Sequence, residues 1–322
     1  MGLSVGFDSS LRYWLTKTAD EALPEPAGSA AIARATAGLR EARAESLPFE
    51  PDERRPLHLL VPDRRLGHRM DGAVAHVISR PLPEGSLCHL SGDNTIASPE
   101  LTYAQMATSE PFLEIVRIGC YLCSTFSIGD DGRDYVGERG QLTTVEALRD
   151  YVDRLPPGTR GVRRAREALA YVIDGLASPM EVFLGMGYGM PPNLGGMGPF
   201  VMHANQRIEI DEQIQELLGS RFLKGDLYLP EFGADLEYDS RRFHTGQYRL
   251  DHTQARRNAI EAMGIKTISA TYGQIDTFAK FENFTWMLRK RLGLDQPEYS
   301  PEERQAQMAL YDTLLSPTSR LF

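Results

Sequence analysis

The sequence predicts an α+β N-terminal domain followed by an α/β domain with a central mixed sheet. Short apolar runs separated by turn residues follow Pro51, as in strands joined by tight connections. The run Pro156-Pro157-Gly158 interrupts the chain near its middle. After Ser178, helix-like and strand-like segments alternate, which is typical of a sheet covered by helices. We expect an N-terminal domain over 1–155, a linker and basic helix over 156–177, a second domain over 178–293 and a helical tail over 294–322.

Composition fits an ordinary globular protein that can bury a sizeable core. The chain has 322 residues, of which 42% are hydrophobic and 25% charged. No apolar run is long enough for a membrane span and the N-terminus lacks a signal peptide, so we expect a soluble, cytoplasmic protein without a membrane partner. Its three cysteines are too few for a disulfide scaffold. The net charge of −9 argues against a general nucleic-acid coat protein, so any contact with DNA must be local.

The first half begins with helical patterns and then changes to strands. Asp8, Ser9 and Ser10 are expected to cap a helix, and the Ala/Arg/Glu-rich segment 30–44 predicts a second helix of a hairpin. Cap residues followed by proline and glutamate, as at 98–100, predict a further helix start. The remaining expected elements are strands at 58–62, 73–79 and 86–90 and helices at 111–126, 145–155 and 159–175.

The second half contains the same helix-start pattern at Ser178-Pro179-Met180-Glu181. Aromatic residues at 278, 281, 284 and 286 have nearly helical spacing, which favours a role in the core. The other expected elements are strands at 200–210, 226–229, 235–238 and 265–270 and helices at 253–263 and 275–292.

Carboxylates cluster in the stretch from Gly225 to His244. Asp226 lies on one predicted strand, and Glu237 and Asp239 lie on the next, with a turn at 230–233 between them. Hairpin pairing would place Asp226 and Glu237 side by side. Such an oxygen-rich site suits Mg²⁺ or Mn²⁺, which can activate water and stabilise charge on a phosphodiester.

At this point the sequence resembles the PD-(D/E)XK restriction-endonuclease-like superfamily, and more narrowly proteins related to very-short-patch-repair endonucleases. That group shows a helix start S-P-x-E, a strand ending in Asp, a strand reading E-Y-D-G, a following His, and D-x-x-R-R-x-x-L-x-x-x-G. Ser240 replaces the glycine after E-Y-D, the superfamily lysine is absent, and the spacing before the paired arginines is longer. The matching residues here are Ser178 to Glu181, Asp226, Glu237 to Asp239, His244, Asp251, Arg256, Arg257, Ile260 and Gly264.

The resemblance implies roles for these residues. Asp226 and Glu237 would bind the metal, with Glu181 completing the site from the helix. Asp239 takes the place of the superfamily lysine, and His244 would act as a general base or contact a phosphate. Five arginines against one aspartate between residues 241 and 257 predict a local DNA-facing patch. The arginines expected to bind substrate are Arg241, Arg242, Arg256 and Arg257.

A looser resemblance covers residues 56–126. It is to regions that precede such nuclease domains in actinobacterial proteins, some of them similar to abortive-infection antitoxins. The residues that carry it are LHLLVPD (57–63), AVAHVISRPLPEGS (73–86) and IASPELTYAQMA (96–107). It implies an architecture and no chemistry.

Three interpretations stay open. The leading one is a metal-dependent DNA endonuclease, in a defence or toxin–antitoxin setting. The second is an inactive nuclease fold that serves as a DNA-binding or protein-binding regulator. Under either of these, a protein partner for the N-terminal domain and a homodimer stay open. The third is a purely structural interaction protein, in which Asp226 and Glu237 are solvated edge carboxylates and Glu181 merely complements a helix dipole.

Overall fold

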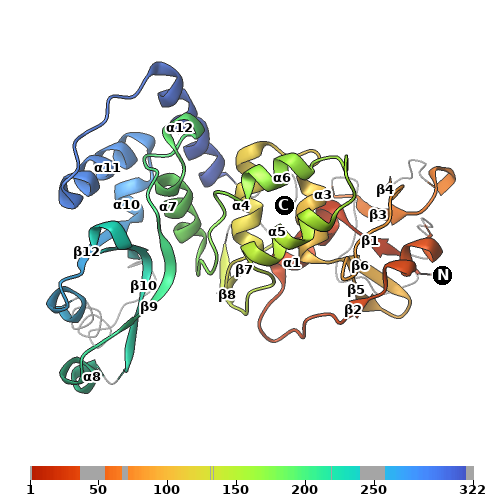
Figure 1. Cartoon of the computed structure of the whole chain (residues 1–322), viewed down its shortest axis with the longest axis horizontal. Coiled ribbons are helices and arrows are strands. Elements are labelled where there is room, and N and C mark those ends of the chain that lie inside the picture. The colour runs from red at the N-terminus through yellow and green to blue at the C-terminus, as the bar shows by residue number, and fades with distance from the viewer. Residues whose placement is uncertain are drawn as a thin grey trace. The chain divides into compact units, whose positions relative to one another are not determined.

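The computed structural model describes residues 2–36, 55–66, 72–130, 132, 134–218, 220–239 and 258–316. The chain divides into two compact units (Figure 1). Unit 1 comprises Met1–Val172 with Ser316–Phe322, and unit 2 comprises Ile173–Leu315. Each unit combines helices with a mixed sheet, so the predicted mixture of α and β structure is confirmed.

Unit 1 is built on a six-stranded sheet with the strand order β2-β5-β6-β1-β3-β4. Strand β1 runs parallel to β6, and β3 runs parallel to β4, while the other neighbours are antiparallel. Strand β3 is buried at its four apolar residues and half-buried at His58, in keeping with a strand inside the sheet. The strands are β1 (Ser4–Val5), β2 (Pro26–Ala27), β3 (Leu57–Val61), β4 (Ala73–Val77), β5 (Leu87–Ser91) and β6 (Asn94–Ala97).

Helices and a separate two-stranded hairpin complete unit 1. The predicted start at Ser98 is confirmed, because its side chain accepts a hydrogen bond from the amide of Leu101 and proline occupies the first helical position. Residues 156–172, expected as a linker and basic helix, belong to this unit. The elements are α1 (Phe7–Thr16), η1 (Ser29–Arg34), η2 (Arg64–Leu66), α3 (Pro99–Met106), α4 (Phe112–Leu122), β7 (Phe126–Ile128), β8 (Tyr135–Glu138), α5 (Val145–Arg154) and α6 (Val162–Ala168).

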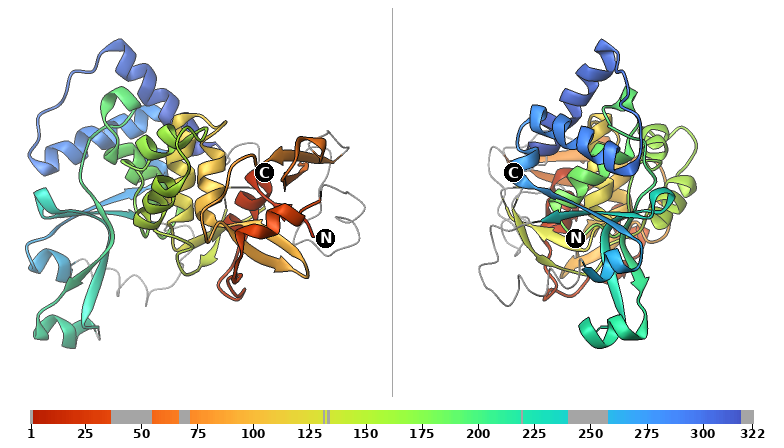
Figure 2. Two further views of the ribbon diagram at one scale, coloured as in Figure 1. Left: turned by 45° about the vertical axis from the view of Figure 1, so that its right-hand side comes forward. Right: turned by 90° about the vertical axis from the view of Figure 1, so that its left-hand side faces the viewer.

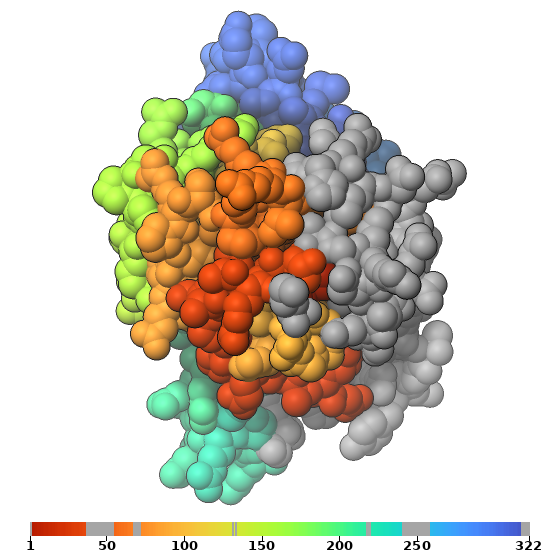
Figure 3. Space-filling model, turned by 90° about the vertical axis from the view of Figure 1, so that its right-hand side faces the viewer, coloured from red at the N-terminus to blue at the C-terminus, as the bar shows by residue number. Residues whose placement is uncertain are grey.

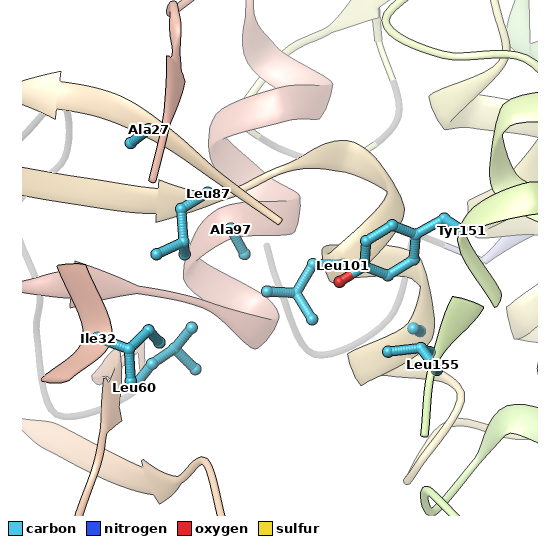
Figure 4. Packing of buried hydrophobic residues seen from close by; sticks show 9 residues of the cluster. Ala27, Ile32, Leu60, Leu87, Ala97, Leu101, Tyr151 and Leu155 are labelled. Atoms are coloured by element: carbon cyan, nitrogen blue, oxygen red, sulfur yellow. The ribbon is translucent and has the colours of Figure 1, made fainter. Parts of the chain in front are cut away.

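One hydrophobic cluster of unit 1 joins the sheet to α3 and α5. Figure 4 shows the ring of Tyr151 reaching from α5 toward Leu101 of α3. The Tyr151 hydroxyl and Ser86 share a hydrogen bond of 2.7 Å, which satisfies the one polar atom of this buried ring. All three cysteines are buried and free, as expected for structural thiols.

Unit 2 contains a four-stranded sheet with the order β12-β11-β10-β9. Strands β11 and β12 are parallel and the other pairs are antiparallel. The long ribbon of β9 and β10 carries α8 (Glu212–Leu218) at its far end (Figure 2). All four strands were expected from the sequence. They are β9 (His203–Glu209), β10 (Phe222–Leu229), β11 (Ala234–Asp239) and β12 (Lys266–Thr271), with η4 (Pro230–Phe232) between β10 and β11.

Aromatic packing joins the helices of unit 2. Phe183 contacts both Phe281 and Tyr311, at ring-centroid distances of 5.1 and 5.7 Å. Residues 301–315, expected as part of a tail, therefore contribute to the core of this unit through α12. The remaining elements are α7 (Pro179–Gly189), η3 (Pro192–Leu194), α10 (Tyr272–Ile275), α11 (Phe278–Leu292) and α12 (Pro301–Leu315).

Four sequence predictions are wrong in detail. The expected helix caps Asp8, Ser9 and Ser10 lie inside α1, which begins at Phe7 after Gly6. The described start of the expected helix 30–44 is a 3₁₀ helix, in which a short turn suffices to bury Ile32. The expected helix 159–175 is α-helical only over Val162–Ala168. Trp286 is 52% exposed, because it lies two residues, or about 200°, beyond the buried Phe284 on α11.

None of the helices in the described ranges combines the length and apolarity required to cross a lipid bilayer.

Candidate functional site

The predicted carboxylate hairpin forms between β10 and β11. Its register pairs Leu227 with Leu236 and Leu229 with Ala234. This pairing ends at Leu227 and Leu236, and the same register continued by one step would place Asp226 opposite Glu237. Residues opposite each other in an antiparallel pair point to the same side of the sheet. Asp226 and Glu237 are both half-buried, so neither is the fully solvated edge carboxylate of the structural interpretation.

A backbone hydrogen bond fixes the Asp226 carboxylate. The amide of Tyr238, the residue after Glu237, donates to Oδ2 of Asp226 over 3.0 Å. A carboxylate held by a main-chain donor loses rotational freedom, because that donor is itself fixed by the strand. The hairpin therefore both positions and orients Asp226.

Glu181 reaches the site from the first turn of α7. The Ser178 side chain caps this helix by accepting a hydrogen bond from the Glu181 amide, and the Ser178 hydroxyl donates to Oε1 of Glu181. The amide of Ala177 donates to Oε2 over 2.8 Å. Glu181 is only 6% exposed, so these contacts replace the water that a surface glutamate would bind.

Glu181 and Asp226 interact electrostatically. The pKa of Glu181 is raised to about 7, first by burial and next by the negative charge of Asp226. Hydrogen bonds from Ala177, Ser178 and Asn205 oppose this rise. Glu181 therefore changes protonation state near neutral pH, and a cation between the two carboxylates would favour its ionised form.

Asn205 connects the helix start to the sheet. Its Nδ2 atom donates to Oε2 of Glu181 over 3.2 Å and to the carbonyl of Gly175 over 2.7 Å. The pairs that flank it on β9 and β10 place Asn205 opposite Asp226. It has a φ of 50°, a conformation that asparagine tolerates better than most residues. Sequence reasoning missed this residue, because its contacts are long-range and no motif marks them.

A second residue, the acid Asp235, also escaped prediction. Asp235 is fully buried, and its carboxylate lies against the α-carbon of Gly225. A Cβ atom at Gly225 would lie 2.5 Å from Oδ1 of Asp235. Glycine directly before Asp226 is therefore required by the close approach of this carboxylate.

Two basic residues lie beside the carboxylates. Lys224 is two residues before Asp226 on β10 and points to the same side of the sheet, about 7 Å away along the strand. It pairs with Arg207 of β9, and both are exposed. The guanidinium of Arg207 lies 3.8 Å from the centroid of the Phe222 ring. This pair supplies positive charge that the sequence analysis had assigned only to the segment after Asp239.

Asp239 ends β11, where it pairs with Thr271 of β12 and is half-buried. The other predicted site residues, His244, Arg241, Arg242, Arg256 and Arg257, lie outside the described residues.

Comparison of the chain with family models, with curated proteins and with solved structures finds no significant match.

The residues present suit a hard cation by their chemistry. Within the described ranges, no three side chains of His, Cys, Asp or Glu are placed as a group that could hold a metal ion. The structure does bring together two carboxylates that repel each other, Glu181 and Asp226, with Glu237 across the hairpin. Carboxylate oxygens are the ligands that Mg²⁺ and Mn²⁺ prefer, so this donor set fits either ion.

Proposed function

We propose that unit 2 is a metal-dependent DNA endonuclease domain of the restriction-endonuclease-like kind. The observation that carries the proposal is that the buried Glu181 lies within electrostatic reach of Asp226, with Glu237 next in register across the hairpin. Coupled carboxylates with perturbed protonation are typical of functional sites. A purely structural glutamate at a helix start requires neither burial nor a second carboxylate.

The residues of this site would have two roles, metal binding and the orientation of the metal-binding carboxylates. Asp226, Glu237 and Glu181 would hold Mg²⁺ or Mn²⁺, which supplies an activated water and neutralises charge on the phosphodiester. The Tyr238 amide orients Asp226, and the Asn205 amide orients Glu181. Glu181 must be ionised to bind a cation, so protons compete with the cation below about pH 7, the pKa of Glu181 in the metal-free protein.

Lys224 and Arg207 support DNA as the substrate. They place two positive charges on the same side of the sheet as Asp226, in a protein whose net charge is −9. Lysine and arginine side chains contact the phosphates of DNA and fix its position, so here they would hold the backbone near the carboxylates. Local basic charge of this kind meets the requirement that any DNA contact be local.

Cleavage of supercoiled plasmid and of single-stranded DNA with Mg²⁺ or Mn²⁺ tests the proposal. Asp226→Asn and Glu237→Gln keep the shapes of the side chains and remove the charges. Glu231→Gln is the matched control, because Glu231 is an exposed acid in the turn of the same hairpin. We expect metal-dependent nicking by the wild type and Glu231→Gln, and a loss of at least about 100-fold in the two site variants.

Binding measurements separate the alternatives. Wild-type protein that binds DNA but cuts no substrate would establish the regulator and overturn the endonuclease. Titration calorimetry with Mn²⁺ gives an independent result, because Asp226→Asn should weaken cation binding whatever the substrate. Wild-type protein that neither binds Mn²⁺ nor cuts DNA would leave the carboxylates with a structural role.

A further inference from the structure

Unit 1 contains a hollow of about 320 Å³, a volume at the lower end of the range for small-molecule sites. Its walls come from the end of β4 and the following segment 78–82, from α3, and from residues 155–160. Figure 3 shows the segment 72–90 (orange) next to residues in yellow-green on one face of the molecule. All these walls belong to one compact unit.

The walls of this hollow are mainly apolar. Leu101 and Leu155 belong to the buried cluster between sheet and helices, and Phe7 and Leu82 pack against that cluster. Apolar walls favour a ligand with a hydrocarbon or aromatic body.

A buried donor in the wall requires an acceptor. Gln105 lines the hollow and is 5% exposed. Its Oε1 accepts a hydrogen bond from the amide of Phe7 over 2.7 Å, which fixes the orientation of the side-chain amide. Its Nε2 then carries the hydrogens, and among the described residues this nitrogen has no hydrogen-bond partner. Such a buried donor is costly unless something in the hollow accepts from it.

Phe7 is held in a conformation that few residues adopt. Its φ is 49°, and its ring stacks on His76 with 3.7 Å between centroids. A left-handed backbone at a bulky residue persists only where surrounding contacts impose it, and such positions concentrate at binding sites. Here the strained residue lines the hollow and donates its amide to Gln105.

Two arginines lie on the rim. Arg80 and Arg160 are both exposed and line the hollow, and none of its described lining residues is acidic. The guanidinium of Arg80 donates to the carbonyl of Pro157, which anchors it on the loop after α5. A guanidinium has five N–H donors in a planar fork, so an anchored arginine still offers donors to an oxyanion.

We propose that this hollow binds a small carboxylic acid with an aliphatic or aromatic body. The carboxylate lies at Arg80 and Arg160, the apolar body contacts Phe7, Leu101 and Leu155, and an acceptor atom of the ligand meets Nε2 of Gln105. Unit 1 is thereby a ligand-binding unit. The proposal does not depend on the proposed function of unit 2.

Fluorescence of the probe 1-anilinonaphthalene-8-sulfonate with the full chain tests the site, because the probe combines an aromatic body with an anion. We expect saturable binding by the wild type and a Kd raised about tenfold or more in Arg80→Gln/Arg160→Gln. Both arginines are exposed, so these changes leave the core intact. Arg163→Gln is the matched control, since Arg163 is exposed on α6 and does not line the hollow. It should bind the probe as the wild type does.

Displacement of the probe identifies the ligand class. Octanoate should displace it at concentrations at least about tenfold lower than octanol or octylamine do, because only octanoate carries a negative charge. Gln105→Leu should weaken the binding of a keto acid more than that of octanoate, which lacks a second acceptor. The proposal fails if the wild type shows no saturable binding, or if Arg80→Gln/Arg160→Gln binds the probe unchanged. It also fails for carboxylates if octyl phosphate displaces the probe better than octanoate does.

Discussion

Asn205 donates a hydrogen bond from Nδ2 to Oε2 of Glu181 over 3.2 Å. This bond stabilises the ionised carboxylate, so Asn205→Gly should raise the pKa of Glu181 above about 7. Glycine keeps the φ of 50° without strain, which separates the loss of the side chain from a change of backbone. Carboxyl-carbon NMR titration measures the shift, with Glu181→Gln identifying the resonance. An unchanged pKa would mean that the bond contributes nothing to the electrostatics of the site.

Glu181→Gln should change the pH dependence of stability. The pKa of Glu181 is raised from 4.5 to about 7, so the folded state binds more protons than the unfolded state between these values. Its contribution to stability is therefore full below pH 4.5 and lost as pH rises through 7. We expect Glu181→Gln to exceed the wild type in stability by roughly 2–4 kcal/mol at pH 8, and by little at pH 4.5. Urea denaturation at both values checks this, with Glu231→Gln as the control.

His76 should make unit 1 sensitive to acid. The pKa of His76 is lowered from 6.5 to about 4, first by burial and then by the charge of His58, whose Nδ1 lies 3.0 Å from Nε2 of His76. The neutral ring is favoured in the folded state, so its contribution is present above pH 6.5 and lost as pH falls through 4. His76→Gln should lose less stability than the wild type between pH 6.5 and 4. The exposed His89→Gln serves as the control in thermal melts and should follow the wild type.

Gly225→Ala should destabilise unit 2. The new Cβ would lie 2.5 Å from Oδ1 of the fully buried Asp235, so the strand or the carboxylate must shift. We expect a loss of about 1–3 kcal/mol in the free energy of unfolding. Gly273→Ala is the matched control, because a Cβ there meets nothing within 4 Å. Equal stability of the two variants would show that Asp235 moves aside without cost.

Lys224 and Arg207 should govern the salt dependence of DNA binding. Each phosphate contact that is lost lowers the slope of log K against log salt by about 1. Lys224→Gln/Arg207→Gln should therefore reduce the slope by about 2 and weaken binding to all sequences alike. Fluorescence anisotropy over a salt series provides the slope. Arg221→Gln is the control, because Arg221 is exposed before β10, and an equal effect of that variant would exclude a localised patch.

The features that could be predicted from the sequence were those determined by neighbouring residues. The helix starts at Ser98 and Ser178 and the hairpin between β10 and β11 agree with prediction, because caps and tight turns are determined by neighbouring residues. Trp286 was misassigned to the core because its spacing is close to helical without matching the face that Phe281 and Phe284 share. A difference of one position on a helix changes which side a side chain faces.

Long-range contacts could not be predicted in this way. Asn205 meets Glu181 across 24 residues of sequence, and Gln105 meets Phe7 across 98. Each contact depends on how strands and helices pack, which no spacing in the sequence encodes. The burial of Glu181 could not be predicted either. Its position at a helix start indicated only a favourable interaction with the helix dipole. Its raised pKa comes from the sheet that covers it.

The length of the connection from Leu229 to Ala234 sets the pairing register of β10 and β11. Strand side chains alternate between faces with a period of two, so inserting or deleting one residue among Pro230 to Gly233 would shift the pairing by one position. Asp226 and Glu237 would then project to opposite faces, although both residues and their strands were unchanged. The number of residues in this turn is therefore as important to the site as the two acids themselves. Natural variation should change which residues form the turn far more readily than how many there are.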